Sequence, residues 1–432
     1  MDAYFYTLGC KVNQYETQAM MHLMEANGHS AGEYFLGKTQ VESGAIVINS
    51  CTVTGESDRK LRQLLRRCRR DNPQAVLVLT GCMPQAFPDT AALLDADIVL
   101  GNASRRCLPA YLEQFLKTGE RSVCVAEHDT EYEPLRIGKF QGRTRAFVKI
   151  EDGCNRFCTY CIIPYARGRV RSRSLEDLKQ ELTCLAQNGY TEVVLVGINL
   201  TAYGQDSGLN IADAVECACE IDGIRRVRLG SLEPDHLTDE VIDRLARYSK
   251  LCPQFHVALQ SGCDATLKRM NRHYDTAHYR RVCDRLREVF PDCALTTDVM
   301  VGFPGETQEE FERSLAFVKD IDFSRLHCFA YSRREGTIAA KAPNQVTKTE
   351  KERRNRLMIA AGEESCARYA EHLIGKTVTV LTETVQEDGV CGYTDTYVPV
   401  VVSDVSEGQL VEVIVTHTEN GVCYGKKKQD EE

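Results

Sequence analysis

The sequence lacks any long hydrophobic run, and no stretch approaches the roughly 20 apolar residues that a membrane-spanning helix needs. Its first ten residues, MDAYFYTLGC, also lack the basic and then apolar layout of a secretory signal. There is no excess of positive charge either, since the formal net charge is −9, so bulk electrostatics do not mark a nucleic-acid binder. With 43% hydrophobic and 27% charged residues, these absences predict a soluble globular protein of the cytoplasm.

Cysteine, in contrast, is abundant. The chain holds 20 cysteines in 432 residues, a length that suggests two or three domains. Nothing in the sequence indicates export, so a disulfide framework is not expected. In a reducing compartment, clustered cysteines more often bind metal or carry out redox chemistry. Cysteines in helix-like stretches without ligand spacing, such as Cys184 and Cys283, are expected to be small core residues.

Three cysteines stand within one short segment, residues 153–173, GCNRFCTYCIIPYARGRVRSR. Cys154, Cys158 and Cys161 (the loop cysteines) follow a C-x-x-x-C-x-x-C spacing and are succeeded by four arginines. A structural zinc site normally draws paired Cys-x-x-Cys ligands from two places, so zinc would need a distant fourth ligand. The alternative is a 4Fe–4S cluster bound at three irons, whose fourth iron stays open for a substrate or cofactor. The spacing favours the cluster and leaves zinc open.

A second group of three cysteines is widely spaced. Cys10, Cys51 and Cys82 (the strand-end cysteines) each end an apolar, β-rich run that leads into a helix-like segment. Because the carboxyl ends of parallel strands meet at one edge of a sheet, these side chains are expected to converge. A chance distribution of 20 cysteines could also produce this placement. The pattern favours, without requiring, a second three-cysteine metal site.

The alternation of strands and helices divides the chain into three parts. Residues 1–120 repeat strand and then helix, which indicates an α/β unit with a parallel sheet. Residues 140–370 contain six further strand–helix units, which suit a partial barrel better than a closed eightfold one. Residues 371–432 hold short strands with glycine-rich turns, typical of a small all-β barrel or sandwich.

Polar residues follow several strands of the central part. They are Asn199, Glu233, Gln260, Ser261 and Tyr331. Residues past the carboxyl ends of barrel strands line the mouth where such folds place their sites. A site at that mouth, beside the loop cysteines, is therefore expected.

Three basic segments stand out against the acidic total. They lie at residues 59–70, 167–173 and 351–356. Any one of them alone is more simply a solvated helix face. Three of them in an acidic protein favour a polyanionic partner.

These motifs resemble those of the radical S-adenosylmethionine (SAM) enzymes, in which such a cysteine loop follows the first barrel strand. More narrowly, the whole chain resembles the methylthiotransferases. TLGCKVNQYET, NSCTVT and GCMPQ are similar to their N-terminal cluster motifs. LQSGCDATLKRMNR, DVMVGFPGET and FAYSRREGT are similar to their barrel, and LIGKTVTVL and GYTDTYVPV to their TRAM domain. The resemblance implies a sulfur-donor domain, a partial (β/α)6 radical SAM barrel and a TRAM barrel.

The resemblance also implies roles for the cysteines. The loop cysteines would hold a 4Fe–4S cluster whose open iron binds SAM, and SAM cleavage would give a 5′-deoxyadenosyl radical. The strand-end cysteines would hold a second 4Fe–4S cluster that carries the sulfur to be methylated and transferred. Weaker candidates for SAM contacts in this resemblance are Gly197, Asn199, Gln260 and Asp298.

The implied substrate is adenine C2 in RNA, to which a methylthio group would be added. The base would be presented from a single-stranded loop, as the adenosine 3′ of a tRNA anticodon is. An electron donor, not identifiable from the sequence, is also implied. Three alternatives remain. They are a methylthiotransferase for isopentenyladenosine in tRNA, a methylthiotransferase for a ribosomal protein side chain, and an iron–sulfur RNA-binding protein without catalytic turnover.

The stretch TLGCKVNQYET resembles the methylthiotransferases that act on N6-threonylcarbamoyladenosine rather than on isopentenyladenosine. The threonylcarbamoyl group carries a carboxylate, so its recognition should need a cationic partner. The arginines nearest to the loop cysteines in sequence are Arg167, Arg169, Arg171 and Arg173. These four are the expected candidates for that contact or for RNA phosphates.

Overall fold

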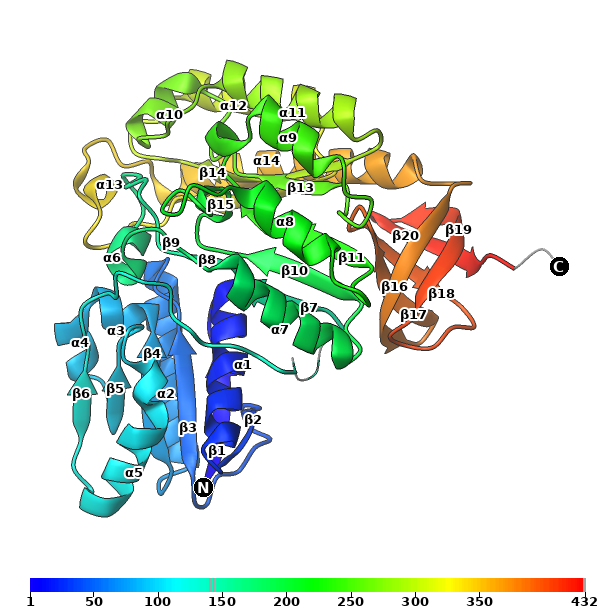
Figure 1. The fold of residues 1–432 in the computed structure, drawn as a ribbon. Coiled ribbons are helices and arrows are strands. Elements are labelled where there is room, and N and C mark those ends of the chain that lie inside the picture. Colours follow the sequence, from blue (N-terminus) through cyan, green and yellow to red (C-terminus); the bar gives the residue numbers. More distant parts are fainter. Residues whose placement is uncertain (140–141, 143, 430–432) are drawn as a thin grey trace.

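The computed structural model describes residues 1–139, 142 and 144–429, which form three units along the chain (Figure 1). The N-terminal unit is a parallel sheet with helices on both faces, and the central unit is an open barrel. The C-terminal unit is a small closed barrel. This is the fold class predicted from the sequence. Within the described residues, no helix is both long and apolar enough to cross a bilayer.

The N-terminal sheet has six parallel strands in the order β2-β1-β3-β4-β5-β6. They are β1 (Asp2–Thr7), β2 (Ser30–Glu33), β3 (Ala45–Ser50), β4 (Val76–Gly81), β5 (Ile98–Leu100) and β6 (Ser122–Cys124). β3 and β4 are buried along their whole length, as strands covered on both faces must be. The sequence pattern misses β2 and β6, because these short edge strands carry no apolar run.

Five helices accompany this sheet. They are α1 (Lys11–Ala26), α2 (Gly55–Asp71), α3 (Cys82–Ala86), α4 (Pro88–Ala92) and α5 (Leu108–Thr118). α1 and α5 pack on one face, while α2 and α4 pack on the other. Leu61, Leu64, Leu65 and Cys68 form the buried stripe of α2, so its basic residues lie on the outer side.

The central unit contains six parallel strand positions, as the sequence predicts. They are β7 (Ala146–Lys149), β10 (Glu192–Val196), β11 with β12 (Arg226–Leu229, Ser231–Leu232), β13 (Gln254–Val257), β14 (Ala294–Val301) and β15 (Arg325–Ala330). The third position is interrupted at Gly230, so that β11 pairs with β10 while β12 pairs with β13. Backbone hydrogen bonding therefore divides the barrel into a three-stranded and a four-stranded sheet.

Helices alternate with these strands along the chain. The longer ones are α7 (Leu175–Gln187), α8 (Ile211–Cys219), α9 (Asp239–Leu245), α11 (Thr276–Val289), α12 (Gln308–Ile321) and α14 (Lys348–Glu371). Ser174 and Thr307 cap α7 and α12 by accepting a backbone N–H of the first turn. Glu310 completes a capping box with Thr307, so α12 begins where its local sequence specifies.

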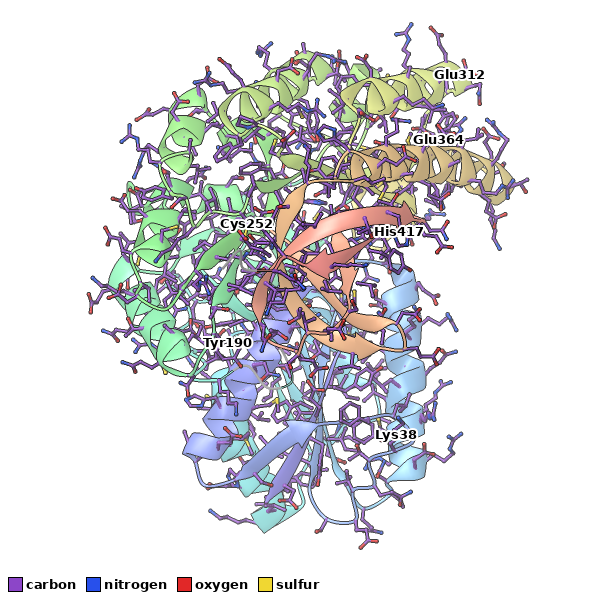
Figure 2. All side chains as sticks on the ribbon, turned by 90° about the vertical axis from the view of Figure 1, so that its right-hand side faces the viewer. Lys38, Tyr190, Cys252, Glu312, Glu364 and His417 are labelled. Carbon is purple, nitrogen blue, oxygen red and sulfur yellow. The ribbon has the colours of Figure 1, made fainter. Side chains whose placement is uncertain are left out.

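The C-terminal unit is a closed five-stranded barrel, consistent with a TRAM domain. Its strands are β16 (Thr377–Gln386), β17 (Gly389–Thr394), β18 (Pro399–Val402), β19 (Leu410–Glu419) and β20 (Val422–Lys427). Arg228 of β11 donates to the backbone carbonyls of Asp395 and Thr394, at 2.8 and 3.1 Å. The small barrel therefore docks beside the central barrel (Figure 1), and in Figure 2 it faces the viewer.

Helix α1 belongs to two cores at once. Met20, Met21 and Met24 pack into the N-terminal sheet, whereas Val12 and Tyr15 pack into the core of the central barrel. This shared helix fixes the carboxyl edge of the N-terminal sheet against the open side of the barrel (Figure 1). Cys10, at the N-cap of α1, is thereby placed between the two units.

Candidate functional site

The loop cysteines lie in a segment that folds back on itself. The segment contains the paired strands β8 (Glu151–Asp152) and β9 (Arg171–Ser172) and, between them, the short helix α6 (Ile163–Arg167). Gly153 opens the loop at φ +89°, and a β-carbon there would lie 1.9 Å from the carbonyl oxygen of Arg169. No other residue fits at this position, so the glycine is required for the loop to close.

The three loop thiols interact electrostatically. Burial, with a smaller contribution from the Cys158 thiol, raises the pKa of Cys154 to about 11 and that of Cys161 to about 12. Arg272, from the segment after α10 (Asp264–Arg269), donates from Nη1 to Cys158 Sγ at 3.4 Å. Thiols in such surroundings release their protons when a bound metal compensates the charge.

A buried carboxyl group stands beside the loop cysteines. Asn199 Nδ2 lies 3.9 Å from Cys154 Sγ, and the Asn199 backbone N–H donates to Glu151 Oε2 at 2.8 Å. A β-carbon on Gly197 would lie 2.6 Å from the same oxygen, so the glycine permits this close approach. Glu151 Oε1 is buried without a hydrogen-bond partner in the described part of the chain, and burial raises the pKa of Glu151 well above its usual value. Gly197 and Asn199 are thus placed beside the loop, and their contact with SAM stays a prediction.

Gln260 follows β13, and Asp298 lies in the neighbouring strand β14. Gln260 adopts a left-handed conformation at φ +63° and bridges to β14 through hydrogen bonds with the Asp298 carbonyl (2.9 Å) and the Met300 N–H (2.8 Å). The Asp298 side chain instead faces a cavity, where Oδ2 lies 3.4 Å from His256 Nε2. A role of these two residues in binding SAM stays a prediction.

The strand-end cysteines come together at one edge of the N-terminal sheet. Cys51 and Cys82 directly follow β3 and β4, and Cys10 follows β1, the neighbour of β3. A β-carbon on Gly9 would lie 3.1 Å from Cys51 Cβ. Gly81, at φ +103°, approaches β3 so closely that a β-carbon there would lie 2.5 Å from a backbone oxygen. Strand order and two glycines together gather residues that are far apart in sequence.

Arg167, from the segment that carries the loop cysteines, reaches the sheet edge that carries the strand-end cysteines. Arg167 Nε donates to Cys82 Sγ at 3.1 Å. Burial raises the pKa of Cys82 to about 12, while the Arg167 charge opposes that increase. Burial also raises the pKa of Cys10, whose Sγ donates to Asn13 Oδ1 at 3.3 Å. The segment that carries the loop cysteines thus supplies a cation to the strand-end cysteines.

Arg167 is held by a buried ionic network that joins the two units. Its guanidinium pairs with Glu16 of α1 and lies 3.5 Å from Asp152 of β8. Lys149 and Arg105 also pair with Glu16, at 3.2 and 2.6 Å. Burial alone would raise the pKa of Glu16, but Arg105 and Arg167 lower it to about 2. Glu16 is therefore an ionised carboxylate surrounded by cations, beneath the edge that carries the strand-end cysteines.

This network corrects the expectation for the four arginines after the loop. Arg167 is fully buried, and Arg173 is buried in ion pairs with two carboxylates of α7. Arg171 donates to the backbone carbonyls of Arg167 and Arg169. Arg169 alone of the four is exposed, and its guanidinium carbon lies 4.6 Å from the centroid of the Phe157 ring. Three of the four arginines serve internal pairing because the chain folds carboxylates and carbonyls over them.

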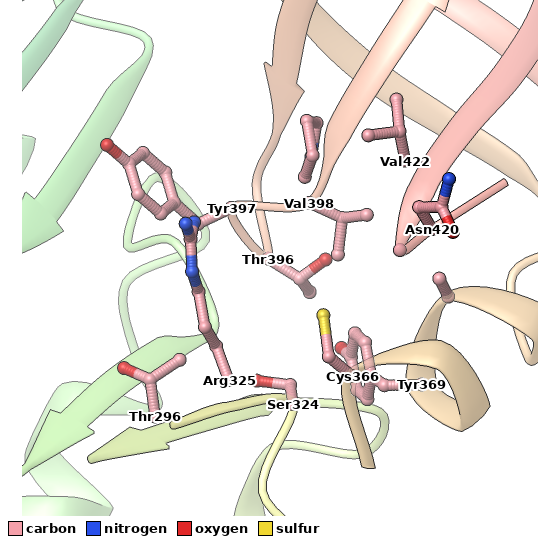
Figure 3. Close-up of a pocket in the computed structure, with 13 residues that line it drawn as sticks. Thr296, Ser324, Arg325, Cys366, Tyr369, Thr396, Tyr397, Val398, Asn420 and Val422 are labelled. Atoms are coloured by element: carbon pink, nitrogen blue, oxygen red, sulfur yellow. The ribbon is translucent and has the colours of Figure 1, made fainter. Parts of the chain in front are cut away.

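Sequence reasoning missed Arg272, which pairs with Glu233 and contacts Cys158. No sequence pattern distinguishes Arg272 from its basic neighbours Lys268 and Arg269. Its role becomes visible only where the cysteine loop packs against it. It also missed two cavities beside the C-terminal barrel, of about 240 and 180 Å³. Thr296, Arg325 and Tyr397 line both, and Figure 3 shows the smaller one.

Both cysteine groups present three sulfur ligands. Within residues 1–139, 142 and 144–429, no three His, Cys, Asp or Glu side chains converge as tightly as one metal ion would require. A cubane cluster has no such requirement, because each thiolate binds a different iron. Three thiols beside an unpartnered carboxyl oxygen and a close-approach glycine fit a cluster with an adjacent cofactor.

Comparison with known proteins decides the family. Two family models match: the radical SAM superfamily at residues 148–318 and the uncharacterized protein family UPF0004 at residues 2–101. The threonylcarbamoyladenosine tRNA methylthiotransferase MtaB of Bacillus subtilis is 38% identical, over 95% of this chain and 92% of the relative. The chain belongs to the radical SAM methylthiotransferase family.

Other methylthiotransferases show the same extent of similarity. MtaB of Thermotoga maritima is 38% identical, over 91% of this chain and 89% of the relative. A tRNA-2-methylthio-N(6)-dimethylallyladenosine synthase of Clostridium botulinum is 35% identical, over 87% and 85%. The solved structure of the methyltransferase TsrM from Kitasatospora setae, 14% identical, matches the fold with a TM-score of 0.56, over 78% of this chain and 77% of that one. For this methylthiotransferase, membership of the radical SAM superfamily implies one 4Fe–4S cluster and SAM.

Proposed function

We propose that this methylthiotransferase converts N6-threonylcarbamoyladenosine, 3′ of the tRNA anticodon, to its 2-methylthio derivative. The observation that carries the proposal is the placement of two three-thiol groups at one interface, where Arg167 reaches from the segment of the loop cysteines to Cys82 and Glu16. Two relatives at 38% identity bear names that state this substrate. In this proposal residues 1–120 form the sulfur-donor domain, residues 140–370 the radical SAM domain and residues 371–432 the TRAM domain.

The loop cysteines would hold the SAM-binding cluster. With SAM, this cluster supplies one-electron chemistry that removes a hydrogen atom from an otherwise unreactive carbon. Gly197 leaves room for Glu151 Oε2 beside the loop, and Asn199 keeps an amide beside Cys154. Arg272 places a cation next to Cys158, where it offsets the charge of the thiolate.

The strand-end cysteines would hold the second cluster. Cys82 is almost fully buried and Arg167 is fully buried, so water is excluded from the contact between these two residues. Arg167 would stabilise the Cys82 thiolate. Its ion pair with Glu16 of α1 also holds the N-terminal unit against the barrel. These residues would hold the sulfur that is transferred at a fixed position relative to the SAM site.

The RNA would contact both the C-terminal barrel and helix α2 of the N-terminal unit. Helix α2 directs Lys60, Arg62 and Arg66 outward, and none of the three has an ion pair among the described residues. Phosphate contacts of this kind orient an RNA without reading its sequence. The base itself must leave its stack to reach a buried site, which an anticodon loop permits.

A second candidate substrate is N6-dimethylallyladenosine, also called isopentenyladenosine. The relatives from Clostridium botulinum, at 34–35% identity, bear that name. An uncharged dimethylallyl group needs an apolar pocket, whereas a threonylcarbamoyl group needs a cation. A ribosomal protein side chain remains the further alternative, and the outward cations of α2 favour RNA over it.

The deciding experiment is mass spectrometry of tRNA nucleosides from cells with and without the gene. We expect 2-methylthio-N6-threonylcarbamoyladenosine to disappear and its unmethylthiolated precursor to accumulate. Loss of the dimethylallyl product instead would establish the second candidate. Anaerobic incubation of the purified enzyme with reductant and SAM should give 5′-deoxyadenosine, and its absence would indicate a binding protein without turnover.

A further inference from the structure

A cavity of about 240 Å³ lies where the three units of the chain meet. Its charged and aromatic lining consists of Lys11, His256, Asp298, Arg325, His327 and Tyr397. Lys11 comes from the start of α1, the histidines, Asp298 and Arg325 from β13 to β15, and Tyr397 from the C-terminal barrel. Lys11 directly follows Cys10, so the cavity is one residue along the chain from a strand-end cysteine.

Two basic side chains face this cavity without a carboxylate partner. Lys11 and Arg325 are both exposed, and neither side chain makes a hydrogen bond or ion pair with any residue of the described ranges. Arg145 and Arg228, which lie nearby against the Tyr397 ring, are by contrast paired with Glu192. The cations of the surrounding wall are therefore neutralised, and those of the cavity are not.

The single carboxylate of the cavity does not remove this surplus. Asp298 Oδ2 lies 3.4 Å from His256 Nε2, so its nearest basic partner is a histidine. His256 Nδ1 lies 3.1 Å from Thr296 Oγ1, and the His256 and His327 rings are 6.4 Å apart. The positive charges of Lys11 and Arg325 exceed the single negative charge of Asp298, so one further anion would balance the charge of the cavity.

We propose that Lys11 and Arg325 form an anion subsite that binds the carboxylate of the substrate's N6-threonylcarbamoyl group. This inference rests on the proposed function and adds the residues that set its specificity. A cavity of this size holds roughly eight water molecules at about 30 Å³ each, which is comparable with the substituent. The base would then lie on the Cys10 side, with its substituent directed away from the strand-end cysteines.

The same geometry explains why an uncharged substituent would be disfavoured. Filling the cavity with a dimethylallyl group would take water from Lys11 and Arg325 and return no counter-charge. A site built for a polar group rejects an analogue that lacks it, because its own polar groups are left unpaired. The subsite thus selects for a carboxylate and against an apolar group at once.

The test uses anticodon stem-loop RNAs that differ only in this carboxylate. One carries N6-threonylcarbamoyladenosine, the second carries its methyl ester and the third carries adenosine. Binding affinity and methylthiolation rate are measured for the reconstituted wild-type enzyme and for Arg325→Gln and Lys11→Gln. Arg313→Gln is the matched control, because Arg313 pairs with Glu309 on the exposed face of α12 and does not line the cavity.

We expect the wild-type enzyme and Arg313→Gln to prefer the acid over the ester about 10-fold to 100-fold, as a charge-assisted pair provides. In Arg325→Gln the preference should fall to within a few-fold. Lys11→Gln should behave likewise with its iron content intact. Equal binding of acid and ester by the wild type, or an undiminished preference in both variants, overturns the subsite. Failure to methylthiolate any of the three RNAs overturns the proposed function instead, while the binding ratios still decide the subsite.

Discussion

The two groups of cysteines reach similar arrangements by opposite routes. The loop cysteines lie within a single folded segment, and Gly153 allows that segment to close. The strand-end cysteines come from three strands and meet only because β1, β3 and β4 are neighbours in the sheet. One group is therefore a property of local sequence, and the other is a property of strand order.

The groups also differ in the cation that accompanies them. Arg272 reaches Cys158 from a segment of the same barrel, whereas Arg167 reaches Cys82 from the other group's loop. Arg167 is also fully buried and pairs with Glu16 across the interface. The loop group can thus form within its own unit, while the strand-end group depends on docking of the two units.

The largest effect should come from removing the loop group. Replacing all three loop cysteines by alanine should abolish SAM cleavage and remove about half of the roughly eight irons that two clusters contain. Iron analysis and a 5′-deoxyadenosine assay after anaerobic reconstitution check this. Cys184→Ala is the control, because Cys184 lies on α7 outside both groups and should keep all of its iron. A wild-type chain that holds only zinc would refute two clusters.

Removing one member of the strand-end group should separate the two roles. Cys82→Ala should give no methylthio product yet still form 5′-deoxyadenosine, because the loop group does not depend on Cys82. Arg167 keeps its pairs with Glu16 and Asp152 in this variant, so the interface should persist. Complete loss of SAM cleavage in a folded Cys82→Ala chain with its loop cluster intact would contradict this division.

The dependence of the strand-end group on docking can be tested through Arg167. Arg167→Met leaves Glu16 buried with an incomplete set of cations, so the free energy of unfolding should fall by about 3–5 kcal/mol. The exposed Arg169→Met should change it by less than about 1 kcal/mol. Urea unfolding of the reconstituted proteins measures both, and Glu16→Gln combined with Arg167→Met should recover part of the loss. Equal stability of the two single variants would show that the network does not hold the units together.

The smallest effect should be on RNA binding by α2. This helix follows Cys51, which lies at the sheet edge that carries the strand-end cysteines. In the double variant Arg62→Gln with Arg66→Gln, the plot of log affinity against log salt should become less steep. The magnitude of its slope should fall by roughly 0.7–0.9 for each RNA phosphate that no longer contacts an arginine. Both clusters should keep their iron. Arg70→Gln is the control, since Asp71 already pairs with Arg70. Fluorescence titration of tRNA at several salt concentrations measures the slopes, and unchanged slopes would place the RNA elsewhere.

Much of the fold follows from the sequence for physical reasons that operate locally. The fully buried β3 and β4 are visible as unbroken apolar runs, and Thr307 with Glu310 marks the start of α12. The six strand positions of the barrel follow from the same pattern. The strands β2 and β6 escape it because edge strands need few apolar residues.

The candidate site divides in the same way. The spacing of the loop cysteines and the strand-end position of the others are both visible in the sequence, because each depends on a local pattern. The burial and ion pairing of the arginines after the loop could not be predicted from the sequence. Arg167 and Arg173 look like exposed basic residues until Glu16 and α7 pack over them.

Local patterns along the chain therefore specify the helices and strands and the chemistry of six thiols. The packing of distant segments specifies which charges are used internally and which stay free: Arg167 within a buried network, Lys11 and Arg325 beside an open cavity. The physical reason is that a spacing is set by covalent geometry along the chain. The pairing of a charge is set by whichever distant segments pack against it, and sequence order does not specify them.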